Sequence, residues 1–260
     1  MSREKSKVYS YLLESIKKKG CIHFVLIDPE KTSPSEASKI ALTAENAGST
    51  AIMVGGSLGV SEKMTDEVVL AIKRSGVGIP VILFPGGISG ISKYADAIWF
   101  LSVLNTSSIY HIIGAQMQGA IIVKKYGLEA ISLAYLILGK GGAAGYVSYS
   151  RPIPFDHPEL AAAYALAAKY MGFKFVYLEG GSGGDPVPPA VIRLVKKISE
   201  MPVIVGGGIK TRQLAYNAAR AGADGIVTGT VIEESQNLES ILKEILEGIQ
   251  SGVKDRTKNQ

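Results

Sequence analysis

Eight short apolar runs alternate with helix-length segments along this chain, and this alternation limits its possible folds more than any other feature. The runs are rich in Val and Ile and show no polar alternation, which is typical of parallel strands covered on both faces. They span residues 21–28, 49–56, 79–87, 96–102, 130–139, 173–181, 201–208 and 223–230. Because the 260 residues contain no linker or break in composition, the pattern predicts a single-domain α/β TIM (β/α)8 barrel over 1–260.

One connection between runs is too short for this repeat. Only "ISGISKYA", residues 88–95, lies between the third and fourth runs, and eight residues are too few for a covering helix. We therefore expect a missing or shortened third helix. The gap is either filled by neighbouring side chains or is an exit groove for a long apolar ligand. At the two ends of the chain we expect an N-terminal helix over 1–20 and a polar tail over 252–260.

Composition and charge exclude several classes of protein. No apolar run approaches the roughly 18 residues of a membrane span, and the charged N-terminus lacks a signal-peptide core, so we expect a cytoplasmic protein. The net charge is +5, with lysines in helix-like segments. We interpret these as solvated helix faces; attraction to phosphorylated substrates or transient contact with a membrane surface is the alternative.

Other partners and ligands are disfavoured by what the chain lacks. Few aromatic residues lie among the basic ones, which argues against nucleic acid. Cys21 is the only cysteine, so no internal disulfide can form. His23, His111 and His157 are scattered without the spacing of zinc ligands, and we expect structural or surface roles for them.

In a barrel of this kind the active site lies at the carboxyl ends of the strands. The sixth, seventh and eighth runs end in "GGSGG", "GGG" and "TGT". Glycine has no Cβ, so several backbone N–H groups can point together at an anion. These three turns therefore predict a phosphate site, unless the glycines only permit tight turns.

Two acids occupy other strand ends. Glu179 follows the sixth run, beside the predicted phosphate site. A phosphorylated polyol reconciles the two, because its phosphate binds the glycines while a hydroxyl donates to Glu179 as general base; a structural ion pair is the alternative. Asp28, with Ser57 after the second run, is a sparse site for a hard cation that a diphosphate completes. Asp28 as a turn residue before Pro29 is the alternative.

Six motifs carry a resemblance to a known family. "FVLIDPEK", "IMVGGS", "ILFPG", "YLEGGSG", "VGGGI" and "VTGT" follow in order between about Ile22 and Glu234. In these motifs the chain resembles the geranylgeranylglyceryl phosphate synthase family. The resemblance implies a TIM-barrel prenyltransferase that uses Mg²⁺ and joins the C3 hydroxyl of sn-glycerol 1-phosphate to geranylgeranyl diphosphate. That reaction releases diphosphate and is the first committed step of archaeal membrane phospholipid synthesis.

The resemblance also implies roles for individual residues. Asp28 and Ser57 would hold Mg²⁺, and Glu179 would be the catalytic residue. The expected glycerol 1-phosphate site consists of Tyr177, Leu178, Glu179, Gly180, Gly181, Ser182, Gly183, Gly207, Gly208, Gly229 and Thr230. Trp99 or Phe100, next to the short connection, would close the prenyl channel and set chain length, unless both are ordinary core residues. Relatives imply a homo-oligomer, a dimer or a hexamer.

Three alternatives remain open on the sequence. The same reaction with a longer, heptaprenyl donor is one of them. A sugar-phosphate-processing barrel is the second, although its chemistry needs a paired acid and base or a Schiff-base lysine. The third is a phosphate-binding barrel without turnover.

Overall fold

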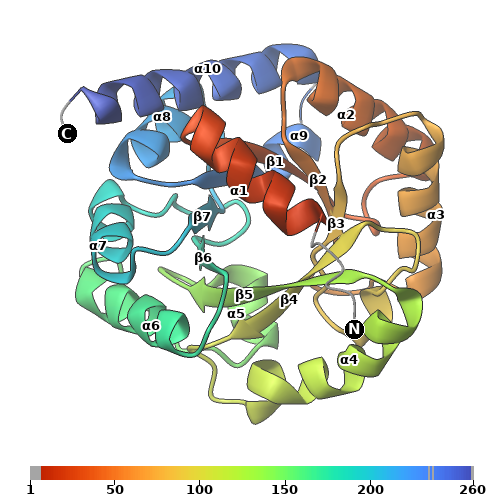
Figure 1. Ribbon diagram of the computed structural model, residues 1–260, viewed down its shortest axis with the longest axis horizontal. Helices are drawn as coiled ribbons and strands as arrows, with labels where there is room; N and C mark the ends of the chain where they lie inside the picture. The colour runs from red at the N-terminus through yellow and green to blue at the C-terminus, as the bar shows by residue number, and fades with distance from the viewer. Residues whose placement is uncertain (1–6, 234, 236, 259–260) are drawn as a thin grey trace.

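Eight parallel strands close into a barrel in the computed structural model, which describes residues 7–233, 235 and 237–258. Each strand pairs with its sequence neighbours, and β8 closes the barrel against β1 (Figure 1). The TIM-barrel prediction is confirmed. The strands are β1 (Ile22–Ile27), β2 (Ala51–Val54), β3 (Val81–Leu83), β4 (Ala97–Val103), β5 (Glu129–Ile137), β6 (Phe175–Glu179), β7 (Val203–Gly206) and β8 (Gly225–Thr228).

Helices form a ring outside the strands (Figure 1). The capping signals read from the sequence are present, as at Ser33, whose hydroxyl accepts from the Glu36 amide in a reciprocal capping box. The helices are α1 (Lys7–Lys19), α2 (Pro34–Ala47), α3 (Glu62–Arg74), α4 (Ala115–Tyr126), α5 (Gly142–Val147), α6 (Pro158–Tyr170), α7 (Pro189–Ser199), α8 (Arg212–Ala221), α9 (Thr230–Glu233) and α10 (Leu238–Thr257), with a 3₁₀ turn η1 (Ile88–Gly90) and a π-turn η2 (Tyr110–Gly114).

The strands are buried on both faces, which explains their unbroken apolar character. One set of side chains fills the barrel interior, including Phe24, Trp99 and Phe175, whose rings pack edge to face. The alternate set, such as Val176 and Leu178, packs under the helices. Helix α1 closes the amino end of the barrel and crosses in front of the strands in Figure 1.

The helix that would follow β3 is absent, as predicted, and the short turn η1 connects β3 to β4 in its place. Strand β3 pairs with β4 at only two positions, Ile82 with Ala97 and Leu83 with Ile98. Strand β4 continues to Val103 and pairs with β5 along its whole length. The upper part of β4 therefore has no strand beside it on the β3 side, and the barrel wall is open there.

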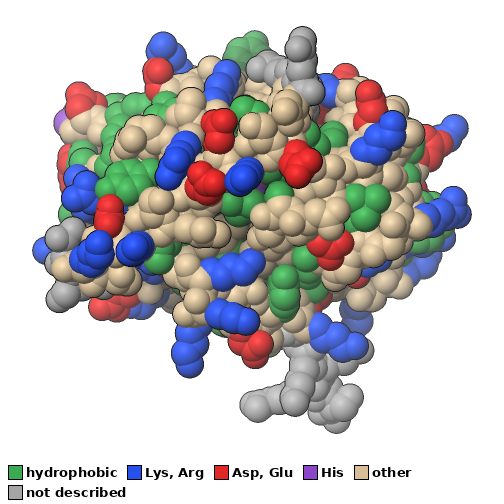
Figure 2. Space-filling model, turned by 90° about the horizontal axis from the view of Figure 1, so that it is seen from above, with side chains coloured by type: hydrophobic (Ala, Val, Ile, Leu, Met, Phe, Trp, Pro, Cys, Tyr) green, Lys and Arg blue, Asp and Glu red, His purple; other side chains and the backbone are tan. Residues whose placement is uncertain are grey.

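The C-terminal segment differs from the expected polar tail. Helix α10 runs through Thr257, because Gly252 lets its backbone approach α8 and Arg256 donates to the carbonyl oxygens of Gly20 and Ala219. Residues 1–6 and 259–260, parts of the expected terminal segments, lie outside the described residues. On the face over α10 and α2, positive and negative side chains are interspersed (Figure 2). No helix in the described ranges has the length and apolar character to cross a bilayer.

Candidate active site at the barrel mouth

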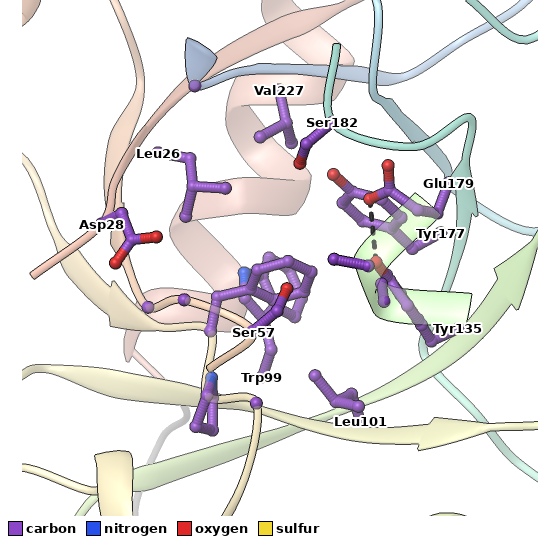
Figure 3. A pocket seen from close by; sticks show the side chains of 18 of the residues that line it. Leu26, Asp28, Ser57, Trp99, Leu101, Tyr135, Tyr177, Glu179, Ser182 and Val227 are labelled. Atoms are coloured by element: carbon purple, nitrogen blue, oxygen red, sulfur yellow. Dashed lines mark hydrogen bonds between the residues drawn. The ribbon is translucent and has the colours of Figure 1, made fainter. Parts of the chain in front are cut away.

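Glu179 is a buried acid at the end of β6, with 7 % of its surface exposed. Its two carboxylate oxygens accept from different donors. Oε2 accepts from the Tyr135 hydroxyl at 2.8 Å, and Oε1 accepts from the Gly181 amide at 2.7 Å. Figure 3 shows the bond from Tyr135 and places Glu179 on one side of the pocket. Both bonds come from neutral donors, so the carboxylate is held without a paired cation in the described part of the chain.

Burial raises the pKa of Glu179 above that of an ordinary glutamate, while hydrogen bonds from Tyr135, Gly181 and Tyr177 lower it again. Burial also raises the pKa of Tyr135 and Tyr177 well above the usual range. Both phenols therefore stay protonated and act as donors. A carboxylate with a raised pKa is suited to accept a proton near neutral pH.

The turn after β7 contacts the turn after β6 closely. Gly207 and Gly208 both have positive φ, +85° and +71°, a conformation that side chains disfavour. A Cβ on Gly207 would lie 2.6 Å from the Gly181 amide nitrogen and 2.6 Å from Glu179 Oε1. No hydrogen-bond acceptor for the Gly207 and Gly208 amides lies within the described ranges. Two free N–H groups thus lie beside the buried acid, which is the arrangement that a phosphate group requires.

Asp28 lies at the end of β1, at the opposite side of the mouth (Figure 3). Its carboxylate occupies the space that a Cβ on Gly56 would need, at 2.4 Å. Ser57 follows directly and lines the same cavity. Within the described residues no group of three or more His, Cys, Asp or Glu side chains is placed to hold a metal. Two hard oxygen donors over a glycine backbone fit a cation that takes its other ligands from water and substrate.

One cavity of about 360 Å³ joins these features. From the mouth the cavity continues over β4 to the outside of the barrel. There it enters the gap that results because no α-helix follows β3. In this gap it is lined by apolar residues of β4, of α4 and of the segment that follows η1, including Ile91, Ile98, Phe100 and Val123. Gly119 of α4 lines the passage, and a Cβ there would just contact Ile91 at 3.4 Å, so a larger side chain would enter the passage. The groove interpretation of the short connection thus has a structural basis.

The structure brings most of the predicted site residues together. The cavity lining includes Asp28, Ser57, Tyr177, Glu179, Ser182, Gly183, Gly207, Gly208, Gly229 and Thr230. Three expected residues are not in the lining. The side chain of Leu178 faces away from the cavity and is buried under the helices. Gly180 and Gly181 lie behind the lining, where the Gly181 amide holds Glu179.

Trp99 and Phe100 lie on opposite faces of β4. Trp99 is 1 % exposed in the barrel interior, against Phe24 and Phe175. Phe100 faces outward and lines the groove. The alternation of the strand therefore gives the two aromatic residues different neighbours, and only Phe100 contributes to the outer part of the groove.

Three cavity residues were not expected from the sequence. Tyr135, which holds Glu179, lies within an apolar run and resembles a core residue. Gln116 lies in the first turn of α4 and donates to the carbonyl oxygens of Leu101 and His111, which ties α4 to the open edge of β4. His111 lines the cavity near α5, and burial lowers its pKa. A π-turn at the start of α4 is a signal for such a site, but it is visible only in the structure.

The fold and the site together define a class: an α/β-barrel enzyme with a buried acid, free glycine amides and an apolar groove at one mouth of the barrel. Comparison with known proteins narrows this class. The PcrB family model matches residues 14–249. A geranylgeranylglyceryl phosphate synthase of Thermofilum pendens is 58 % identical over 98 % of this chain and 99 % of its own. The enzyme of that name from Pyrococcus abyssi is 51 % identical over 95 % and 98 %. The chain belongs to the PcrB family.

Solved structures agree with this assignment. The (S)-3-O-geranylgeranylglyceryl phosphate synthase of Thermoplasma acidophilum, solved in complex with its substrate sn-glycerol-1-phosphate, superimposes with a TM-score of 0.90. It is 43 % identical over 94 % of this chain and 98 % of its own. Tryptophan synthase of Mycobacterium tuberculosis also matches, with a TM-score of 0.62 at 15 % identity over 93 % and 98 % of the two chains. At that identity the likeness is one of fold alone.

Proposed function

We propose that this protein is a Mg²⁺-dependent prenyltransferase. It joins the C3 hydroxyl of sn-glycerol 1-phosphate to the geranylgeranyl group of geranylgeranyl diphosphate. One observation carries the proposal: a single cavity connects free glycine amides, a buried acid and an apolar groove through the barrel wall. Each part matches one part of the two substrates. The Thermoplasma relative solved with sn-glycerol-1-phosphate supports the choice of acceptor.

The acceptor lies between the turns after β6, β7 and β8. Its phosphate takes the free amides of Gly207 and Gly208, with Ser182 and Thr230 close by in the same lining. Its terminal hydroxyl then reaches Glu179, whose carboxylate has an acceptor position left beside its bonds from Tyr135, Gly181 and Tyr177. The phosphate and the acid therefore bind different ends of one small molecule, and their negative charges do not compete for the same space.

The donor's diphosphate lies across the mouth at Asp28 and Ser57. These residues would hold Mg²⁺ through a carboxylate and a hydroxyl, and the substrate and water would supply the other ligands. When bound, Mg²⁺ neutralises the charge of the departing diphosphate. The prenyl chain extends through the gap between β3 and β4 and along the groove formed by Phe100, Gly119 and Val123.

In the reaction the allylic carbon–oxygen bond to diphosphate breaks and a bond from that carbon to the acceptor oxygen forms. The hydroxyl proton passes to Glu179, and the electron pair of the broken bond leaves with diphosphate. The protein holds the two reactants in line, which replaces a bimolecular encounter with a local one. The buried carboxylate accepts the proton only as the oxygen becomes positive, so it need not generate a free alkoxide.

We also propose that the enzyme acts in the cytoplasm as a homo-oligomer, a dimer or a hexamer. The exposed face of α4 and the turn before it supports self-association, because Ile109, Ile113, Met117 and Ile121 are 56–76 % exposed at a spacing of four residues. Light scattering should give the mass of a dimer or a hexamer. A monomer at micromolar concentration would contradict the proposal.

Radiolabelled sn-glycerol 1-phosphate, incubated with Mg²⁺ and farnesyl, geranylgeranyl or heptaprenyl diphosphate, tests the function. We expect an ether lipid product that is formed fastest with the geranylgeranyl donor and is abolished by a chelator. A preference for heptaprenyl diphosphate would assign the longer donor. Binding of the acceptor without product from any donor would indicate a phosphate-binding barrel without turnover and overturn the proposal.

A further inference from the structure

Tyr135 donates a hydrogen bond from its hydroxyl to the Glu179 carboxylate, with Oε2 at 2.8 Å. It projects from β5 into the barrel, one layer beneath the acid, because Tyr135 pairs with Tyr177 and Ile137 with Glu179. Its hydroxyl reaches Oε2 from this lower layer (Figure 3). The upper side of the carboxylate is left for a ligand in the mouth.

Packing fixes the Tyr135 ring in this place. The ring is 6 % exposed. It contacts Phe84 edge to face, with centroids 5.7 Å apart, and Tyr177 at 5.1 Å. A ring held on two sides gives its hydroxyl a single direction, so the bond to Glu179 is preorganised. The same packing means that removal of the hydroxyl alone leaves the ring and its contacts in place.

We propose that Tyr135 is a positioning residue, which fixes the Glu179 carboxylate in the orientation and ionisation state that accept the acceptor's proton. The inference rests on the proposed function of Glu179 as the base. Without Tyr135, the Glu179 carboxylate would keep the Gly181 amide on Oε1 and the Tyr177 hydroxyl, but it would lose the donor that holds Oε2 from below.

The charges around Glu179 explain why a neutral donor matters here. Strand β5 presents Tyr135, β6 presents Tyr177, and the turn after β7 presents only glycine backbone. No cation within the described ranges forms an ion pair with Glu179. Burial raises the pKa of the acid, and Tyr135 opposes this more strongly than Gly181 or Tyr177 does. Loss of the Tyr135 hydroxyl should therefore raise the pKa of Glu179 further.

Tyr135→Phe tests the inference in the full-length enzyme through the pH dependence of turnover. The base works when ionised, so a higher pKa should move the acid limb of the kcat profile to higher pH. At pH values below the pKa of the base, we expect turnover to fall by about 10- to 100-fold, which corresponds to the loss of one hydrogen bond to a charged group. Turnover should approach that of the parent at high pH, and KM for glycerol 1-phosphate should change by less than about threefold.

A matched control is Tyr216→Phe. Tyr216 donates to Asp255 Oδ2 at 3.0 Å, between α8 and α10, so the variant deletes the same kind of bond outside the site. Its pH profile should match that of the parent. If Tyr135→Phe fails to fold, 3-fluorotyrosine at position 135 retains the bond and makes the phenol a stronger donor. The acid limb should then move to lower pH.

A uniform loss of turnover at every pH in Tyr135→Phe, or an unchanged profile, would overturn the positioning role. A parent enzyme without transferase activity would instead overturn the proposed function. In that case the ¹³C chemical shift of labelled Glu179, assigned by its loss in Glu179→Gln, still decides the inference. The titration should move to higher pH in Tyr135→Phe, and an unchanged titration would refute the role of Tyr135.

Discussion

A single added methyl group at Gly207 should strongly weaken phosphate binding. Gly207 has φ +85°, and a Cβ there would lie 2.6 Å from Glu179 Oε1 and 2.6 Å from the Gly181 amide nitrogen. Gly207→Ala therefore combines left-handed strain of about 1–2 kcal/mol with overpacking of about 1–3 kcal/mol. The atom in the way at Gly181 is backbone, so the two turns have to separate.

Separation of the turns should misdirect the amides of Gly207 and Gly208. Each hydrogen bond to a charged group contributes about 1.5–3 kcal/mol, so loss of both bonds should weaken binding of glycerol 1-phosphate by more than about 100-fold. Isothermal titration calorimetry measures this affinity, and thermal unfolding measures the cost in stability.

Gly172→Ala is the matched control for this substitution. Gly172 has φ +88°, and a Cβ there would meet nothing within 4 Å. It should cost only the strain of about 1–2 kcal/mol and leave the affinity unchanged. If Gly207→Ala bound glycerol 1-phosphate as tightly as Gly172→Ala does, the turn after β7 would not be the phosphate site.

Further predictions concern the acid, the cation, the groove and a buried histidine. Glu179→Gln should lower kcat by about 10²–10⁴-fold with a smaller effect on glycerol 1-phosphate affinity; equal rates would remove Glu179 from the chemistry. Asp28→Asn should raise the Mg²⁺ concentration for half-maximal rate at least about tenfold, and an unchanged Mg²⁺ titration would remove Asp28 from the cation site. Gly119→Leu should slow reaction of the geranylgeranyl donor more than of the farnesyl donor; equal slowing would place the prenyl chain outside the groove. Burial lowers the pKa of His23 to about 3, so below pH 6.5 the unfolded chain binds a proton that the folded chain does not. The free energy of unfolding should therefore fall as pH drops from 6.5 toward 3, by at most about 5 kcal/mol. His23→Gln should make stability, measured by urea unfolding, less dependent on pH in this range, and the same dependence in both proteins would contradict the prediction.

Much of the fold could be predicted because barrel strands leave a strong local signal. Runs buried on both faces are continuously apolar, and helix caps such as Ser33 and Gly48 mark the segments between them. The short third connection was readable from length alone. The end of α10 was not, because Lys254 and Arg256 read as a polar tail, while the contacts that keep the helix ordered come from α8 and the Gly20 carbonyl.

Site residues that directly follow a strand could be predicted from the sequence. Site residues that reach the cavity only through the pairing register of two strands, or through the packing of a helix, could not. Glu179 and the glycines at 207 and 208 follow their strands directly, and the barrel rule then places them at one mouth. Tyr135 meets Glu179 only through the pairing of β5 with β6. Gly119 lines the groove only because α4 packs opposite η1 across the gap. Because β4 is apolar on both faces, its sequence also does not indicate whether Trp99 or Phe100 points into the barrel.

A crystal structure with sn-glycerol 1-phosphate bound tests the central claim most directly. The account predicts the phosphate oxygens within hydrogen-bond distance of the Gly207 and Gly208 amides, and the terminal hydroxyl on Glu179. A phosphate bound at Asp28 and Ser57, or a glycerol hydroxyl directed away from Glu179, would contradict it.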